Sequence, residues 1–393
     1  MSSNRAARRQ RKRTTPKDDF LGRLLSFFPD QVSLVGRYTN TSLGFADDGP
    51  LRVFLPDFHW MSVTCLGRYT GGYQFNGNKR LHDGAPTFAT LLKVLEQVAH
   101  DGGAPLEVFQ LGDRYDLWRE LTTDDHGNVM EAYRRIRQDP GVSGLADRLD
   151  TLGTKYIRGN HDHWLGTIQS QIPDPGLPEL ETNDRKIYLT HGHRYDNIER
   201  LLPDDVQAFG VGLAPKVKPA KHDIGPFTND NLEKINAFLT LRDKIGPHHS
   251  LYPSVRPDGA LPITTAGDLT AIERTHQAYL DLTRFWHGDE DRNDFEHVNY
   301  LTFGDKILQF EQSHKNDHVL HVIGHTHHAR LLVDRLPGDK PFVIMDTGGW
   351  IEDCTIRQGD GQAFRAPSAQ FGTQQGNDIR LYQLGGTLPG DSN

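Results

Sequence analysis

The feature that most constrains the fold is a series of short apolar runs that each end in Asp, Asn, His or Gly. The runs are LRVFL at 51–55 (followed by Pro56-Asp57), LEVFQLGD at 106–113, TKYIRGNHD at 154–162, KIYLTHGH at 186–193, HVLHVIGHTH at 318–327 and PFVIMDTGGW at 341–350. Short apolar runs predict buried strands, and residues 85–99 have the apolar spacing of a helix. The sequence therefore predicts an α/β fold whose polar residues gather at the carboxyl ends of strands, where such folds build their sites.

The residues that follow these runs include many that can bind metal ions. The candidate ligands are Asp57, His59, Asp113, Asn160, His191, His325 and His327. Each short motif is weak alone, but seven donors exceed what one ion needs and suit two. Oxygen and nitrogen donors without thiolate favour Mn²⁺, with Fe or Zn²⁺ as alternatives. A carboxylate shared between two such ions would hold them ~3.5–4 Å apart, the separation that clamps a phosphoryl group and the attacking oxygen.

Taken in order, the motifs D-x-H, G-D-x-x-D, G-N-H-D, H-G-H and G-H-T-H resemble those of the calcineurin-like metallophosphoesterase superfamily. The resemblance covers roughly residues 51–200 and 318–350. It implies a two-sheet β-sandwich flanked by helices. It also implies that one metal is held by Asp57, His59 and His327 and the other by Asn160, His191 and His325, with Asp113 bridging.

The same resemblance implies catalytic roles for two further residues. His161 is expected to lie over the substrate phosphate, with Asp162 orienting it. The expected reaction is hydrolysis of a phosphate ester or pyrophosphate linkage, in which a metal-bridging hydroxide attacks phosphorus in line. His161 would stabilise the transition state or protonate the leaving oxygen. The sequence offers no convincing G-x-S-x-G elbow or P-loop for a different mechanism.

Within the superfamily, LGDRYDLW, HGHRYD and DTGGW look most like the UDP-diacylglucosamine pyrophosphatase-like group. The sequence departs from that group at Pro56, where Ser is usual, and in the long segment between the fourth and fifth motifs. Because insertions often shape the pocket, the substrate identity does not transfer. The expected substrate class is broader: a phosphorylated small molecule, or a nucleotide-linked or lipid-linked phosphate.

Two further residues beside the motifs are candidates for substrate contact. Arg114 lies inside the second motif and could reach a phosphate, or it could pair with Asp116 as part of the structure. His193 lies two residues after His191, where a supporting or exposed histidine is favoured over a direct metal ligand, because the metals already have their ligands.

The chain divides into a tail and one large domain. Residues 1–17 are basic and polar and predict a disordered tail, with a tether for an anionic partner as the alternative. Residues 18–393 are expected to form the metallophosphoesterase domain. A helical cap or insertion is predicted at about 200–300, with helices at 231–246 and 268–286.

Composition limits where the protein works and what it binds. The net charge of −8 disfavours a dedicated nucleic-acid binder. No apolar run approaches the ~18 residues of a membrane span, and no signal segment opens the chain. Two cysteines far apart suggest a reducing compartment, so a cytoplasmic protein is expected.

Two other functions fit parts of the same pattern. A nuclease or phosphodiesterase acting on nucleic acid or nucleotides could use the basic tail as a tether. A non-catalytic scaffold of the same fold should have lost ligands, and none of the expected ligands is missing.

The stretch HVLHVIGHTHHA at 318–329 contains five histidines. We interpret His325 and His327 as ligands in a loop at the end of a strand. His321 is expected to pack inside the strand, His318 to be exposed before it, and His328 to be a neighbour of the ligands only.

Overall fold

The computed structural model of the protein describes residues 16–68, 74–75, 86–101, 104–117, 120, 128–195, 307–308, 310–312, 317–327, 329–356, 363–367 and 369–385. Residues 1–15 of the predicted tail and the predicted insertion helices at 231–246 and 268–286 lie outside this set. Pro16 and Lys17, which the sequence analysis assigned to the tail, are the first residues of helix α1 (Pro16–Phe27).

The first of three sheets has six strands in the order β1-β14-β13-β2-β4-β5. Its strands are β1 (Val32–Thr39), β14 (Asp378–Leu384), β13 (Gln370–Gln375), β2 (Leu51–Leu55), β4 (Leu106–Gln110) and β5 (Lys155–Tyr156). Strands β2, β4 and β5 are parallel, whereas the other pairs are antiparallel. The carboxyl ends of the three parallel strands therefore meet at one edge of this sheet.

The second sheet has five strands in the order β6-β7-β8-β10-β9, and a small third sheet has the order β12-β11-β3. The strands of the second sheet are β6 (Glu179–Glu181), β7 (Ile187–Thr190), β8 (Leu320–Ile323), β10 (Lys340–Asp346) and β9 (Arg330–Leu336). The third sheet contains β12 (Ala363–Pro367), β11 (Ile351–Ile356) and β3 (Gln74–Phe75). The central strands β7, β8 and β10 are parallel, and antiparallel strands form both edges.

A shared apolar core lies between the two larger sheets. Phe54 of β2 and Phe109 of β4 belong to the same buried cluster as Val322 of β8 and Met345 of β10. Val53, the neighbour of Phe54, belongs instead to the cluster on the opposite face, as the alternation of a strand requires. Both faces of β2 are buried, and the strand is apolar at every position except Arg52, which is typical of a central parallel strand.

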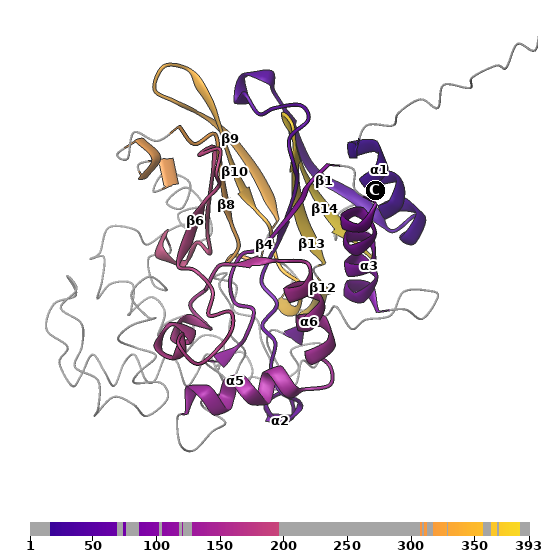
Figure 1. Ribbon diagram of the computed structural model, residues 1–393, viewed down its shortest axis with the longest axis vertical. Helices are drawn as coiled ribbons and strands as arrows, with labels where there is room; N and C mark the ends of the chain where they lie inside the picture. The colour runs from indigo at the N-terminus through magenta and orange to yellow at the C-terminus, as the bar shows by residue number, and fades with distance from the viewer. Residues whose placement is uncertain are drawn as a thin grey trace, which may run out of the picture.

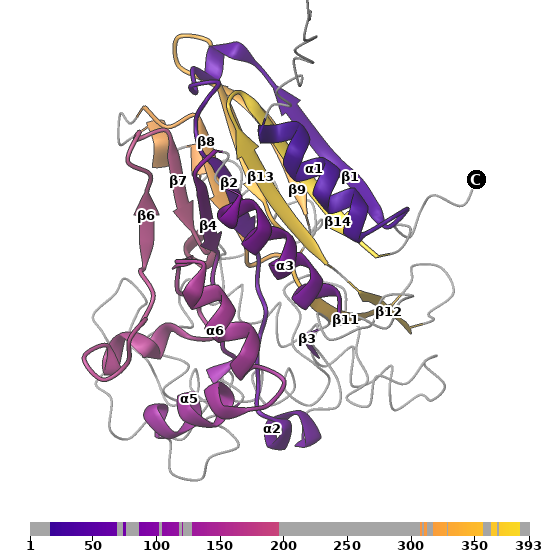
Figure 2. The same cartoon turned by 45° about the vertical axis from the view of Figure 1, so that its right-hand side comes forward.

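Helices cover the outer face of the first sheet, as the two views of the ribbon show (Figures 1 and 2). They are α1, α3 (Thr87–His100) and α6 (Ser143–Thr151), while α2 (Val63–Arg68) and α5 (Val129–Gln138) lie near the end where the parallel strands finish. The helix predicted at 85–99 is confirmed as α3, and its apolar residues Phe88, Leu91, Leu92 and Leu95 are fully buried.

The expected α/β class is confirmed, with mixed sheets and few helices among the described residues. Three short 3₁₀ helices complete these elements: η1 (Thr41–Leu43), η2 (His163–Ile168) and η3 (His193–Tyr195). In the described part of the chain, no helix has both the length and the apolar character needed to cross a membrane.

The prediction that His318 is exposed is wrong, because it belongs to a buried polar network. Glu311 contacts the Nδ1 atoms of His318 and of His321, each at 2.8 Å. The Nε2 atom of His318 lies 3.2 Å from Glu181 of β6, and that of His321 lies 3.4 Å from the Tyr195 hydroxyl. His321 is buried in β8 as expected, but hydrogen bonds as well as packing hold it there. Burial favours the neutral form of Glu311, but the hydrogen bonds from both histidines outweigh it and lower its pKa from 4.5 to about 2.

Glu311→Gln should therefore destabilise the protein in a pH-dependent way. At about pH 6 we expect the thermal midpoint to fall by roughly 5 °C or more, because breaking a buried ion pair costs on the order of 3 kcal/mol. The pKa of Glu311 is depressed on folding, so its contribution is complete above 4.5 and disappears as the pH falls toward 2. Thermal melts of the wild-type protein and of Glu311→Gln between about pH 2 and pH 6 measure the difference between their thermal midpoints. Glu96→Gln, which alters a half-exposed ion pair with Arg148, is the control. A difference in thermal midpoint that does not change with pH would contradict the lowered pKa of Glu311.

Candidate metal centre

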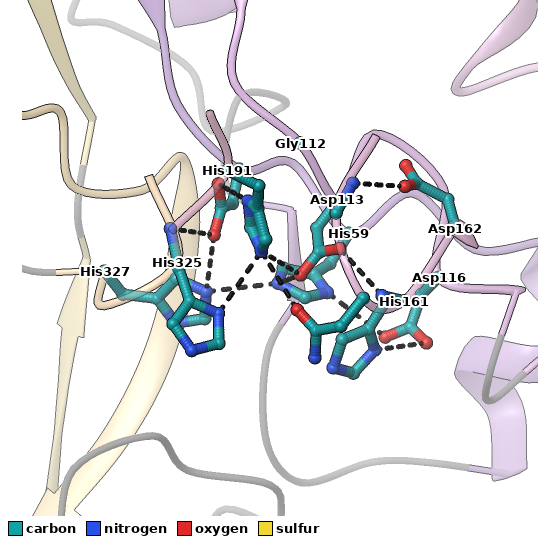
Figure 3. Close-up of polar contacts among 12 residues, drawn as sticks. His59, Gly112, Asp113, Asp116, His161, Asp162, His191, His325 and His327 are labelled. Carbon is teal, nitrogen blue, oxygen red and sulfur yellow. Dashed lines mark hydrogen bonds and ion pairs between the residues drawn. The ribbon is translucent and has the colours of Figure 1, made fainter. Parts of the chain in front are cut away.

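The predicted ligands come together where five parallel strands end. Each ligand lies in the loop that directly follows β2, β4, β5, β7 or β8. Figure 3 shows the side chains of the labelled ligands pointing into one region: His59, Asp113, His191, His325 and His327. Backbone hydrogen bonds connect these loops: His59 N–H donates to Asp113 O at 2.7 Å, and Gly324 N–H donates to His191 O at 2.9 Å. All seven predicted ligands are buried, with His327 the most exposed at 8%.

A first group of donors gathers around the Nε2 atom of His327. This atom lies 3.1 Å from His59 Nε2 and 3.2 Å from Asp57 Oδ2. His59 Nε2 in turn lies 3.6 Å from Asp113 Oδ2. Ligands bound to one ion at ~2.1 Å lie about 3 Å from one another, so Asp57, His59 and His327 are spaced to hold a metal ion.

A second group gathers around the Nε2 atom of His191. It lies 3.0 Å from Asn160 Oδ1, 3.2 Å from His325 Nδ1 and 3.2 Å from Asp113 Oδ2. Asp113, His191 and His325 are likewise spaced to hold a metal ion. The same oxygen of Asp113 thus approaches both groups, which is the position that a bridging carboxylate requires.

The chemistry of this second group fits a cation. The Nδ1 atom of His191 lies 2.7 Å from the Leu111 carbonyl, so in the neutral ring Nδ1–H donates there and Nε2 has only a lone pair. In that form the lone pair faces the donor atoms of Asn160, His325 and Asp113, and such an arrangement is stabilised by a metal cation among them or by a proton on Nε2. The buried Asp113 Oδ2 has His191 Nε2 as a partner at 3.2 Å, whereas Asp57 Oδ1 has no hydrogen-bond partner among the described residues, as expected for an atom that binds a metal ion.

The electrostatics of the three ionisable ligands agree with this. Burial lowers the pKa of His191, but the Asp113 and Asp57 carboxylates outweigh it and raise the pKa to about 10. Burial raises the pKa of Asp57 well above its ordinary value, whereas His191 and His161 overcome burial at Asp113 and lower its pKa well below the ordinary value. A site that attracts a proton this strongly attracts a divalent cation for the same reason.

Strained backbone holds several ligands in place. His59, Asp113, His325 and His327 have φ angles of 49°, 42°, 75° and 61°. Residues other than glycine are uncommon in this left-handed region, and such strain concentrates at functional sites. The surrounding fold therefore stabilises the orientation of these side chains against the local backbone preference.

Two motif glycines allow the close approach of the loops. A Cβ atom at Gly159 would clash with the Asp113 carboxylate, and one at Gly324 would clash with Asp57 Oδ1. These contacts explain why G-N-H-D and G-H-T-H begin with the one residue that has no side chain.

His161 is oriented by Asp116 and not by the predicted Asp162. Its Nδ1 atom lies 3.1 Å from Asp116 Oδ1, and the second oxygen of Asp116 lies 3.4 Å from His59 Nδ1 (Figure 3). The Asp162 carboxylate is occupied elsewhere, by the N–H groups of Gly159 and Tyr115. The physical reason is that the chain turns after His161, so the Asp162 side chain points back toward Gly159 at the start of the same loop. Burial lowers the pKa of His161 to about 4.

The two predicted substrate contacts have different environments. The Arg114 guanidinium lies 4.2 Å from the centre of the Tyr156 ring, and its Nη1 atom lies 3.5 Å from both Asp150 and Asp174. Arg114 is 1% exposed, so its surroundings favour the structural interpretation, with these partners in place of Asp116. The half-buried His193 ring lies 5.4 Å from the ring of His191, and its contact with a substrate stays a prediction.

Two carboxylates beside the ligands, Asp116 and Asp346, have contacts that the sequence did not predict. The spacing G-D-x-x-D was the only signal for Asp116. Asp346, at the end of β10, accepts hydrogen bonds from the Thr326 hydroxyl and from Gly348 N–H. Thr326 lies between His325 and His327, so Asp346 supports the loop that holds both ligands. Burial raises the pKa of Asp346 to about 7. His328 lies outside the described residues.

No family model matches the chain, and no curated protein matches it.

Proposed function

We propose that this protein is a dinuclear metal-dependent phosphoesterase of the metallophosphoesterase superfamily. The observation that carries the proposal is the pair of buried donor groups that share the Asp113 carboxylate. One group is Asp57, His59 and His327, and the other is Asn160, His191 and His325. Two ions that share a carboxylate are the arrangement used to hydrolyse phosphate esters and anhydrides.

The donor set favours hard or borderline ions, so Mn²⁺ is the first candidate, with Fe and Zn²⁺ as alternatives. Such ions, when bound, polarise phosphoryl oxygens and lower the pKa of water toward neutrality. The protein contributes the fixed positions of the ligands, since the left-handed backbone at four of them leaves little freedom to rearrange. Preorganised ligands of this kind reduce the reorganisation needed during reaction.

His161 is the residue best suited to act on the substrate. Asp116 holds its Nδ1–H, which leaves Nε2 as the nitrogen through which the ring acts. With a pKa of about 4 the ring is neutral near pH 7, so it can accept a proton or a hydrogen bond. To protonate a leaving oxygen it must first gain a proton, which the negative charge of a bound phosphate favours.

Turnover of chromogenic esters tests the proposal. We expect Mn²⁺-loaded protein to hydrolyse p-nitrophenyl phosphate, bis-p-nitrophenyl phosphate or a nucleoside diphosphate derivative, and to lose this activity after chelation. Readdition of Mn²⁺ should restore it, because the ligands remain in place. Heat-treated protein with the same Mn²⁺ controls for hydrolysis by the metal itself. Absence of turnover of all three classes with Mn²⁺, Fe²⁺ and Zn²⁺ would contradict the proposal and favour the scaffold interpretation.

A further inference from the structure

The Asp162 carboxylate joins two of the loops that hold the centre. One oxygen, Oδ1, accepts a hydrogen bond from Gly159 N–H at 2.7 Å, within its own loop. The other, Oδ2, accepts one from Tyr115 N–H at 3.2 Å, in the loop that holds Asp113 and Asp116. Asp162 is fully buried, so these bonds are shielded from water. The carboxylate therefore fixes the loop of Asn160 and His161 relative to the loop of Asp113.

Tyr156 supplies the third donor to this carboxylate. It is the last residue of β5, its side chain is 1% exposed, and its hydroxyl donates to Asp162 Oδ2. The Arg114 guanidinium packs on the Tyr156 ring, and its Nη1 atom lies 3.5 Å from both Asp150 and Asp174. This packing, together with the burial of the ring, restricts the position of the hydroxyl.

We propose that Tyr156 is a positioning residue for the metal centre, acting through Asp162 on Asn160 and His161. The expected effect of Tyr156 on kcat rests on the proposed function, whereas its expected effect on Mn²⁺ affinity does not. Without the hydroxyl, Asp162 Oδ2 has only the longer bond from Tyr115, and a buried oxygen that loses a donor is destabilised. The loop then shifts, which moves Asn160 away from His191 and His161 away from Asp116.

The close packing of the same loop makes it sensitive to small shifts. The His161 N–H donates to Asp113 Oδ1 at 2.8 Å, directly beside the point where Gly159 approaches that carboxylate most closely. A displacement of the loop thus reaches the bridging ligand as well as Asn160. Removal of partners that orient metal ligands weakens metal binding or activity by about 10- to 100-fold.

The test replaces Tyr156 by phenylalanine, which keeps the ring beneath Arg114. We expect Mn²⁺ titrations by calorimetry to show at least one ion bound about tenfold or more weakly, with a kcat reduced by a similar factor and KM little changed. Tyr133→Phe is the matched control: Tyr133 is also buried, its ring contacts Tyr115, and it should leave Mn²⁺ affinity unchanged. Asp162→Asn keeps the shape of the carboxylate and should weaken Mn²⁺ binding in the same way.

The possible outcomes separate the two proposals. If Tyr156→Phe is less heat-stable but binds Mn²⁺ with wild-type affinity, Tyr156 only packs and the inference is overturned. If the wild-type protein binds Mn²⁺ but hydrolyses no ester, the proposed function fails while the comparison of affinities still decides the role of Tyr156. Wild-type protein that binds none of Mn²⁺, Fe²⁺ and Zn²⁺ overturns both.

Discussion

Asp113→Asn should abolish phosphoester hydrolysis and reduce the amount of metal bound per chain. The substitution keeps the size of the side chain and an oxygen for the His161 N–H, but it removes the charge that both donor groups share. We expect activity to fall more than about a thousandfold, because bound ions supply several kcal/mol of transition-state stabilisation and about 1.4 kcal/mol corresponds to a factor of ten. Atomic absorption after dialysis against Mn²⁺ measures the metal, and ester turnover measures the activity.

A second buried carboxylate gives the matched control for this prediction. Asp378 of β14 is 4% exposed and pairs with Arg37 and Arg380, far along the chain from the ligands and on a different part of the first sheet. Asp378→Asn should lower the thermal midpoint and leave the bound metal unchanged. Asp113→Asn protein that keeps the wild-type metal content and activity would refute the bridging role.

His161→Ala should separate catalysis from metal binding. The side chain is absent, but the backbone N–H of residue 161 still donates to Asp113, so the bridging carboxylate keeps its partner. We expect the metal content to remain that of the wild type, while kcat falls by about 10²–10⁴, the usual contribution of a positioned acid or base. Metal analysis and kinetics on the same preparation measure both quantities.

His100→Ala is the control for this variant, because the His100 side chain is 87% exposed at the end of α3 and should affect neither quantity. Loss of metal together with activity in His161→Ala would mean that His161 is itself a ligand. Unchanged activity with full metal content would remove His161 from the mechanism.

The sequence predicted the class of the fold because its strands are short and buried. Runs such as LRVFL and KIYLT are short and mostly apolar, as expected of buried central strands, and Asp57 and His191 follow them at the point where parallel strands end. The family resemblance also implied which residues would share an ion, and the distances around His327 and His191 are compatible with that expectation.

The sequence pattern did not predict which carboxylate contacts the His161 ring. Asp162 follows His161 directly and was expected to orient it, yet adjacent residues of a turning loop point in different directions, so Asp116 holds the ring instead. His318 was predicted to be exposed for a different reason. Its partners Glu311 and Glu181 lie in other parts of the chain, and no local sequence pattern predicts that they meet.

The amino-acid sequence by itself thus determined the α/β class, the positions of the strands that end at the centre, and the identity of the candidate ligands, because apolar runs and metal-binding side chains are local properties of the chain. Only the tertiary structure decided the distances among those ligands, the left-handed backbone at His59, Asp113, His325 and His327, and the hydrogen bonds of Asp116, Asp162 and Tyr156. The physical reason is that these properties depend on the packing of two sheets against each other, which brings residues distant in sequence to within hydrogen-bonding distance.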